Sequence, residues 1–154
     1  MDVMASAHAA AALAGMFLEL VRTMKHVIKA MKGARLALVE MLTRAERIRL
    51  NLELFRSLTT RLSDPMERST ALSFNESTYR QTANEVLDLV RKVAGLAKRH
   101  DLWMKVNWLF YRSDVAALVK KLEERERDLG LVLTSIAAYV LNYPWESESP
   151  PQNL

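Results

Sequence analysis

Residues 34–62 read ARLALVEMLTRAERIRLNLELFRSLTTRL, and this stretch decides the fold. Its apolar residues recur at steps of three, four and seven, the spacing that places side chains along one face of an α-helix. The residues on that face are Leu38, Met41, Ala45, Ile48, Leu52, Phe55 and Leu62. The pattern predicts one long amphipathic helix. Ser63-Asp64-Pro65 is expected to end it, because proline disfavours the helical conformation at the residue before it.

Two later stretches show the same periodicity. One opens at Ser73-Phe74-Asn75-Glu76, a capping-box pattern that satisfies free backbone amides at a helix start. Its expected buried face is Tyr79, Ala83, Val86, Val90, Val93 and Ala97. The other is predicted to run from Asp114 to about Asn142, with Ser113 as its N-cap. Its expected apolar side is Val115, Leu118, Leu122, Leu129, Leu133, Ile136 and Val140. On its exposed side, charges such as Glu123 and Arg127 are spaced for pairing four residues apart.

Between these two helices, residues 102–112 (LWMKVNWLFYR) break the periodicity and are expected to form a joint. The joint contains four large aromatic residues, which are Trp103, Trp108, Phe110 and Tyr111. Rings at a helix joint commonly fill the end of a bundle core. A belt at a membrane interface is the alternative, because tryptophan favours that layer.

The remaining helix is predicted over Val3 to Met31, with Gly33 as its terminator. The chain of 154 residues holds only four glycines and four prolines, so it has few turns and must be built from few, long elements. No stretch alternates apolar and polar residues as a strand does. The sequence therefore predicts an all-α domain over residues 1–142, a bundle of four or five long helices. Residues 143–154 are expected to form a disordered linker or tail.

The sequence offers little catalytic chemistry. His8, His26 and His100 lie far apart, with no partner at a metal-binding spacing. The four glycines form neither a phosphate loop nor a dinucleotide fingerprint, and there is no cysteine. We therefore predict a protein that is not an enzyme, with no cofactor and no metal site.

A run of positive charge stands out against this background. No acidic residue lies between Glu19 and Glu40, and five basic residues fall there: Arg22, Lys25, Lys29, Lys32 and Arg35. The first four recur at steps of three and four, so they line one helix face. A solvated outer face explains such a stripe in many proteins. The uncharged segment from Val3 to Leu18 precedes the stripe, however. This layout also suits a helix whose uncharged end inserts into a membrane while its basic end binds anionic headgroups.

Nucleic acid is a third partner to consider, because Arg44, Arg47 and Arg49 lie close together in residues 34–62. Glutamates interrupt these arginines, and the three do not share one narrow face. No helix-turn-helix spacing or stacking platform of aromatic residues accompanies them. We therefore expect no nucleic-acid partner.

Two pieces of the chain resemble a known family. VIKAMKGARLALVEMLTRAERIRLNLELF is similar to the junction of the first two helices in fungal HeLo-like N-terminal domains, which precede the nucleotide-binding and repeat regions of NLR-type proteins. KVNWLFYRSDVAALVKKLEERERDLGLVLTSI resembles a later, tryptophan-centred segment of that family. The matching positions there are Lys105, Trp108, Arg112, Val115, Leu118, Leu122, Leu129, Leu131 and Leu133.

The resemblance implies a helical bundle that executes regulated cell death. Members of the family, like the distantly analogous four-helix executioner of necroptosis, rest in the cytoplasm until an NLR-type or amyloid-signalling regulator activates them. They then form homo-oligomers, release the N-terminal helix and permeabilise the plasma membrane. A helix too short and too alanine-rich to insert alone could insert as an oligomer, whose members cover one another's polar groups.

On this reading two sets of residues carry the function. The expected membrane-insertion residues are Val3, Met4, Leu13, Met16, Phe17 and Leu18. The expected anionic-lipid-binding residues are Arg22, Lys25, Lys29, Lys32 and Arg35. The alternative from a different class is a non-enzymatic protein-interaction or adaptor bundle, without a lipid step.

Overall fold

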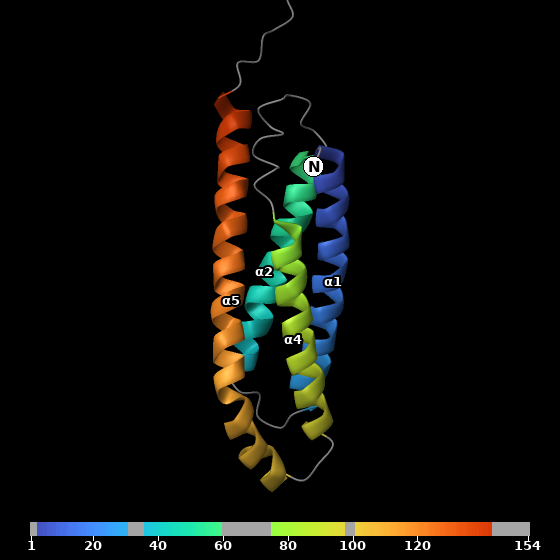
Figure 1. The fold of residues 1–154 in the computed structure, drawn as a ribbon, viewed down its shortest axis with the longest axis vertical. Coiled ribbons are helices and arrows are strands. Elements are labelled where there is room, and N and C mark those ends of the chain that lie inside the picture. The colour runs from blue at the N-terminus through green and yellow to red at the C-terminus, as the bar shows by residue number, and fades with distance from the viewer. Residues whose placement is uncertain (1–2, 31–35, 60–74, 98–100, 143–154) are drawn as a thin grey trace, which may run out of the picture.

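The computed structural model describes the backbone of residues 3–30, 36–59, 75–97 and 101–142, and the side chains of residues 7–30, 36–59, 75–95 and 111–138. The regular structure in these ranges is entirely helical, and the helices are α1 (Val3–Ala30), α2 (Leu36–Thr59), α4 (Glu76–Ala97) and α5 (Asp101–Asn142). They lie side by side along a common axis (Figure 1). The expected all-α bundle is therefore confirmed, with four helices rather than five in the described part of the chain.

The helices occupy the four corners of the bundle. α1 packs along α2 and α4, and α5 packs along the same two helices from the other side. α1 and α4 run in one direction, and α2 and α5 run in the opposite direction (Figure 1). Because α1 and α5 each pack on α2 and α4, they lie at opposite corners of the bundle. The shared direction of α2 and α5 makes these two helices parallel neighbours.

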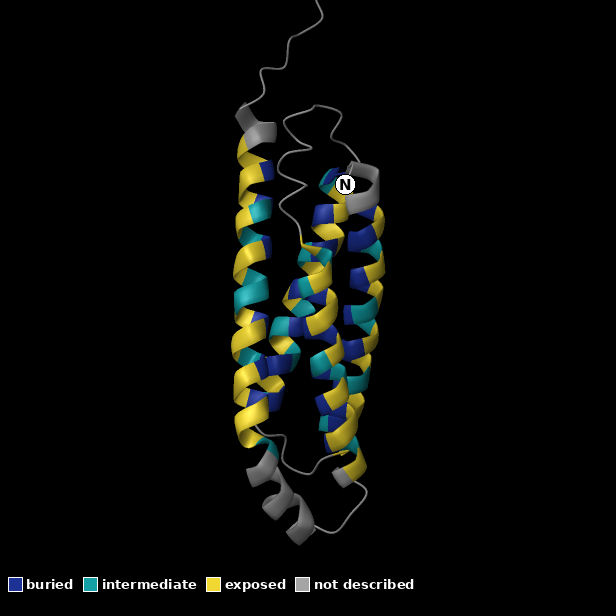
Figure 2. Ribbon diagram, viewed as in Figure 1, coloured by how far each residue is buried: buried dark blue, intermediate teal, exposed yellow. Residues whose placement is uncertain are grey.

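The expected apolar stripes form the core. Buried residues line the inner sides of the helices, while exposed residues cover their outer sides (Figure 2). The buried members of the stripes are Leu38, Met41, Ala45, Ile48, Leu52, Phe55, Tyr79, Ala83, Val86, Val90, Val93, Val115, Leu118, Leu122, Leu129, Leu133 and Ile136. Other parts of the expectations lie outside the described residues: Leu62, the stops at Gly33 and Ser63-Asp64-Pro65, residues 73 and 74, the tail 143–154, and the side chains of Ala97 and Val140.

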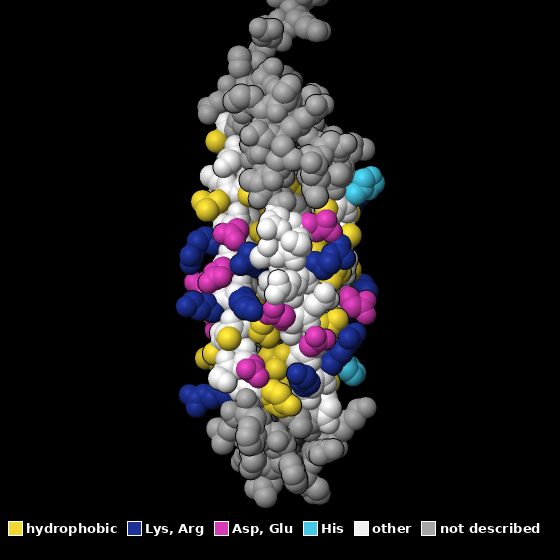
Figure 3. Space-filling model, viewed as in Figure 1, with side chains coloured by type: hydrophobic (Ala, Val, Ile, Leu, Met, Phe, Trp, Pro, Cys, Tyr) yellow, Lys and Arg dark blue, Asp and Glu magenta, His cyan; other side chains and the backbone are white. Residues whose placement is uncertain are grey.

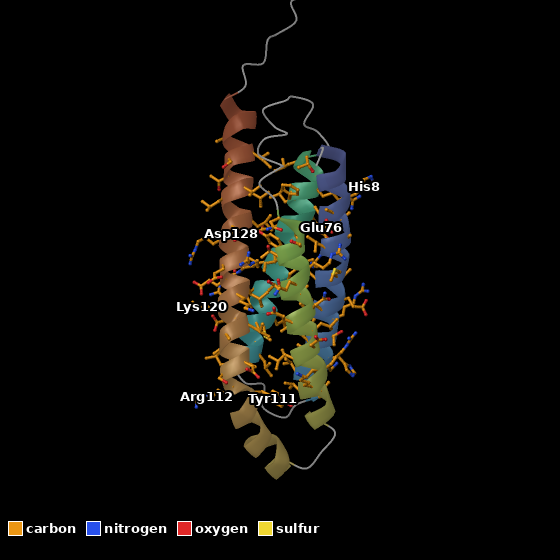
Figure 4. The ribbon with its side chains drawn as sticks, viewed as in Figure 1. His8, Glu76, Tyr111, Arg112, Lys120 and Asp128 are labelled. Carbon is orange, nitrogen blue, oxygen red and sulfur yellow. The ribbon has the colours of Figure 1, made fainter. Side chains whose placement is uncertain are left out.

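The last helix is longer than the sequence predicts. α5 begins at Asp101, so residues 102–112 are helical and Ser113 lies inside the helix instead of capping it. The physical reason is that no proline or glycine occurs between Asp101 and Leu129, so nothing terminates the helix where its apolar period falters. The first turns of α5 are inclined to the rest of the helix (Figure 1). The predicted joint is therefore a change of direction within one helix, near Tyr111 and Arg112 (Figure 4).

The start of α4 also differs in detail from the expectation. The helix begins at Glu76, and the side chain of Asn75 takes the capping position. Its Oδ1 accepts hydrogen bonds from Ser77 Oγ at 2.8 Å and from the backbone N–H of Thr78 at 3.4 Å. Asparagine is among the most favoured N-cap residues, since its side chain reaches the amide three positions on.

Polar contacts join α5 to both of its neighbours. Arg44 and Arg47 of α2 donate to the two carboxylate oxygens of Glu126, at 3.0 and 3.4 Å. On the other side, Lys121 Nζ donates to Glu85 Oε2 of α4 at 2.6 Å. The hydroxyl of Tyr79, also on α4, donates to the backbone carbonyl of Arg125 at 3.1 Å. These contacts fix the position of α5 along the bundle axis relative to α2 and to α4.

The contact between Glu85 and Lys121 predicts a pH-dependent stability. The hydrogen bond from Lys121 lowers the pKa of Glu85 below its ordinary value of 4.5, against the opposing effect of burial. A lowered folded-state pKa stabilises the protein above the unfolded-state pKa, and this stabilisation is lost as the pH falls through the folded-state pKa. We therefore expect the free energy of unfolding to fall on acidification from pH 5 to pH 3, as measured by urea unfolding.

The Glu85→Gln variant tests this assignment, because it keeps the shape of the side chain but cannot titrate. Its free energy of unfolding should be lower than that of the parent at pH 7 and should fall less steeply on acidification. An equally steep fall in the two proteins would show that Glu85 does not contribute to the pH dependence.

Candidate membrane-binding surface

The two faces of α1 differ sharply in their surroundings. Its inner face packs into the core and includes Leu13, Phe17 and Leu20, which are at most 1% exposed. Of the expected membrane-insertion residues, Leu13 and Phe17 are thus fully enclosed by the bundle, while Met16 and Leu18 are half-buried. The side chains of Val3 and Met4 lie outside the described residues. Insertion of this segment would therefore require α1 to leave the core.

The outer face of α1 carries the basic residues. Arg22, Lys25 and Lys29 are all exposed, at the end of α1 that is next to the start of α2. Their spacing of three and four residues places them on one side of the helix, opposite the buried stripe. The structure therefore brings three of the five expected lipid-binding residues together. Lys32 and Arg35 lie outside the described residues.

The ion pairs found among the described residues do not include these three cations. Among the described residues, no carboxylate oxygen lies within 4 Å of the charged groups of Arg22, Lys25 or Lys29. The charge of Lys25 does reach Glu46 of α2. Its pKa is lowered mainly by the hydrogen bond from Arg49, with a smaller effect from the charge of Lys25. The positive charge of the stripe is therefore almost uncompensated by the described part of the bundle.

The arginines in the middle of α2 behave differently. Arg44 pairs with Glu40, Glu123 and Glu126, and Arg49 pairs with Glu46 at 2.6 Å and with Glu53 at 3.1 Å. These contacts raise the pKa of both guanidinium groups in spite of burial, which acts in the opposite direction. The arginine cluster considered for nucleic acid is thus engaged within the protein.

Other basic residues also lack a carboxylate within 4 Å in the described part of the chain. They are Arg56, Arg91, Lys92, Arg112 and Lys120. They are distributed over α2, α4 and α5, and no three of them follow one another along a single helix face. On the face of α4 and α5, acidic and basic side chains are intermixed (Figure 3). The α1 stripe is therefore distinguished by the continuity of its charge.

α1 is attached to the bundle mainly by apolar contacts. The polar contact found between the described part of α1 and another helix joins Arg80 Nη1 to the sulfur of Met16 at 3.8 Å, a weak interaction. By contrast, α5 is joined to α2 and α4 by charged hydrogen bonds. His8, near the start of α1, points outward from the bundle (Figure 4).

No family model, curated protein or solved structure matches this chain. In the described ranges, no helix combines the length and the apolar character that a membrane crossing requires. No group of three or more histidine, aspartate or glutamate side chains in those ranges is arranged to hold a metal ion.

The sequence analysis missed an exposed apolar set on α2. Four large apolar residues lie outside its buried stripe: Leu36, Val39, Leu50 and Leu54. They fall between the members of the stripe, so the outer side of α2 carries apolar as well as charged side chains. A count of apolar residues off the stripe could have found them. Of the aromatic cluster, Tyr111 is half-buried against the core, and the side chains of Trp103, Trp108 and Phe110 lie outside the described residues.

Proposed function

We propose that this bundle is a membrane-targeting domain of the regulated cell-death type, which binds acidic membranes and permeabilises them as an oligomer through α1. The observation that carries the proposal is the run of three exposed cations on α1, which have no ion-pair partner among the described residues and lie next to a long uncharged segment of the same helix. Each basic residue near an acidic membrane contributes about 1 kcal/mol to binding.

The attachment of α1 supports the second part of the proposal. Departure of α1 breaks apolar contacts with α2 and α4 but leaves the charged contacts among α2, α4 and α5 intact. The apolar contacts that are lost in water are replaced when the same side chains enter a lipid phase. Membrane binding thus offers α1 an environment that compensates for the lost core.

Leakage from dye-loaded vesicles tests the proposal. The folded protein should release dye from vesicles that contain phosphatidylserine and not from vesicles of phosphatidylcholine alone. We expect the Ala12→Arg/Gly15→Arg variant to retain binding but to lose leakage, because each central charge opposes insertion by about 2.5–3.5 kcal/mol. Both positions are exposed, and a side chain added at Gly15 meets open space, so the fold should tolerate the change.

The Ala116→Arg/Ala137→Arg variant is the matched control, because it adds the same charge at two exposed positions of α5. It should cause leakage as the parent does. Absence of leakage with the folded parent, or equal leakage by both double variants, would overturn the role of α1.

The adaptor alternative is favoured by a different observation. Leu50 and Leu54 on α2 and Leu131 on α5 are about half or more exposed, and a protein partner could cover them. A partner-binding bundle should form stable complexes in solution without lipid. Oligomers that form equally well after deletion of residues 1–18, without any vesicle binding, would favour this alternative.

A further inference from the structure

Exposed apolar side chains lie close to the cationic stripe. Leu36, at the start of α2, is 83% exposed, and Val39 is 38% exposed. α1 ends at Ala30 and the antiparallel α2 begins only six positions later, so the stripe and these two residues share one end of the bundle (Figure 1). A small apolar pocket is lined by Val27 and Ile28 of α1 and by Leu38 of α2, so the end of α1 and the start of α2 lie at the same height along the bundle axis.

The two features also face the same side. Val39 and Glu46 are seven residues apart on α2, two turns, so they lie on the same side of that helix. Glu46 is close enough to Lys25 for the lysine charge to act on it. Val39 therefore lies on the side of α2 next to α1. The stripe and the two apolar residues thus share one end of the bundle and lie on two neighbouring helices.

We propose that the folded bundle docks on acidic membranes with this end, before any movement of α1. Leu36 and Val39 enter the interfacial layer, while Arg22, Lys25 and Lys29 contact lipid phosphates. The inference rests on the lipid binding of the proposed function and adds the orientation and the apolar anchors. Amphipathic surfaces that combine leucine with lysine and arginine bind acidic membranes in this way.

Other occupants fit this surface less well. Nucleic acid would use the cations but would leave Leu36 and Val39 in water. A second copy of the chain would have to place two unpaired basic stripes close together. Two apolar side chains are also far fewer than the roughly 20–30 residues that each partner contributes to a stable protein interface. A lipid surface uses both features at once.

Depth-dependent quenching tests the docking orientation. The chain has no cysteine, so single cysteines at positions 36, 39, 54 and 131 can each carry a fluorophore. Leu54 is on the same helix but about 22 Å from Val39 along its axis, at 1.5 Å per residue. On vesicles that contain phosphatidylserine and nitroxide-labelled lipid, we expect quenching at positions 36 and 39 and little at 54 and 131.

Equal quenching at all four positions would overturn the orientation while leaving lipid binding in place. A failure of the unlabelled parent to bind vesicles would instead overturn the proposed function, and the docking with it.

A pair of serine substitutions gives an independent readout. We expect Leu36→Ser/Val39→Ser to weaken binding to phosphatidylserine vesicles about tenfold, because the apolar side chains that enter the interface are removed. The control is Leu131→Ser, which removes a leucine that is 63% exposed on α5 and should leave binding unchanged. Circular dichroism checks that both variants are folded. Parent-like binding by the double variant would overturn the role of the two anchors.

Discussion

Replacing Phe17 by alanine is expected to lower the free energy of unfolding by about 3–5 kcal/mol, the usual cost of removing a buried aromatic ring from a packed core. Phe17 is completely buried and lies in the central part of α1. Small domains are stable by about 5–15 kcal/mol, so the variant should be marginal. Urea unfolding followed by circular dichroism measures the difference. A change below 1 kcal/mol would contradict the burial of this ring.

A pair of leucines separates loosening of α1 from general destabilisation. Leu20 of α1, which is not one of the expected insertion residues, and Leu129 of α5, at the corner opposite α1, are both at most 1% exposed, and replacing either by alanine should cost about 2–5 kcal/mol. If α1 is the membrane-active helix, Leu20→Ala should release dye from acidic vesicles faster than the parent, and Leu129→Ala should do so much less. Equal acceleration in the two variants would point to global unfolding as the cause of leakage.

Reversal of the cationic stripe is expected to have the second large effect. The triple variant Arg22→Glu/Lys25→Glu/Lys29→Glu should bind phosphatidylserine vesicles at least 100-fold more weakly, because three contributions of about 1 kcal/mol are lost and new repulsion is added. The side chains are exposed, so the bundle should remain folded. Vesicle co-sedimentation over a range of salt concentrations measures the loss. The parent should bind more weakly as salt rises, since added ions screen the attraction.

A matched control changes the net charge by the same amount elsewhere. Arg56 lies near the end of α2, away from the docking end, and Lys120 and Arg127 lie in the middle of α5; all three side chains are exposed. Lys120 is on the side of α5 away from α1 (Figure 4). Their replacement by glutamate should weaken binding far less than reversal of the stripe. Equal losses would show that the protein responds to net charge and has no specific surface.

Local periodicity made the helices predictable. The buried stripes on α2, α4 and α5 follow from spacings of three and four residues, which report only on the helix that contains them. The pairing of Glu123 with Arg127, at 3.8 Å, is local in the same sense. The start of α5 was predicted wrongly, because cap residues such as Ser113 are also tolerated inside a long helix where no glycine or proline lies nearby. The positions of the basic residues on one face of α1 were likewise readable from their spacing.

The arrangement of the helices determined what those residues can do. Arg44 meets Glu126 across 82 positions because α2 and α5 are parallel neighbours, and this neutralises the arginines that seemed available for a partner. Lys25 and Lys29 remain unpaired because no acidic side chain of an adjacent helix comes within 4 Å in the described structure. The proximity of Leu36 and Val39 to the stripe depends on the antiparallel packing of α1 and α2. The sequence by itself determined the helical class and the buried stripes of α2, α4 and α5, though not where α5 begins, since such a stripe is a property of a single helix. Only the tertiary structure decided which charges are compensated and which surfaces combine, because both depend on contacts between helices that are distant in the chain.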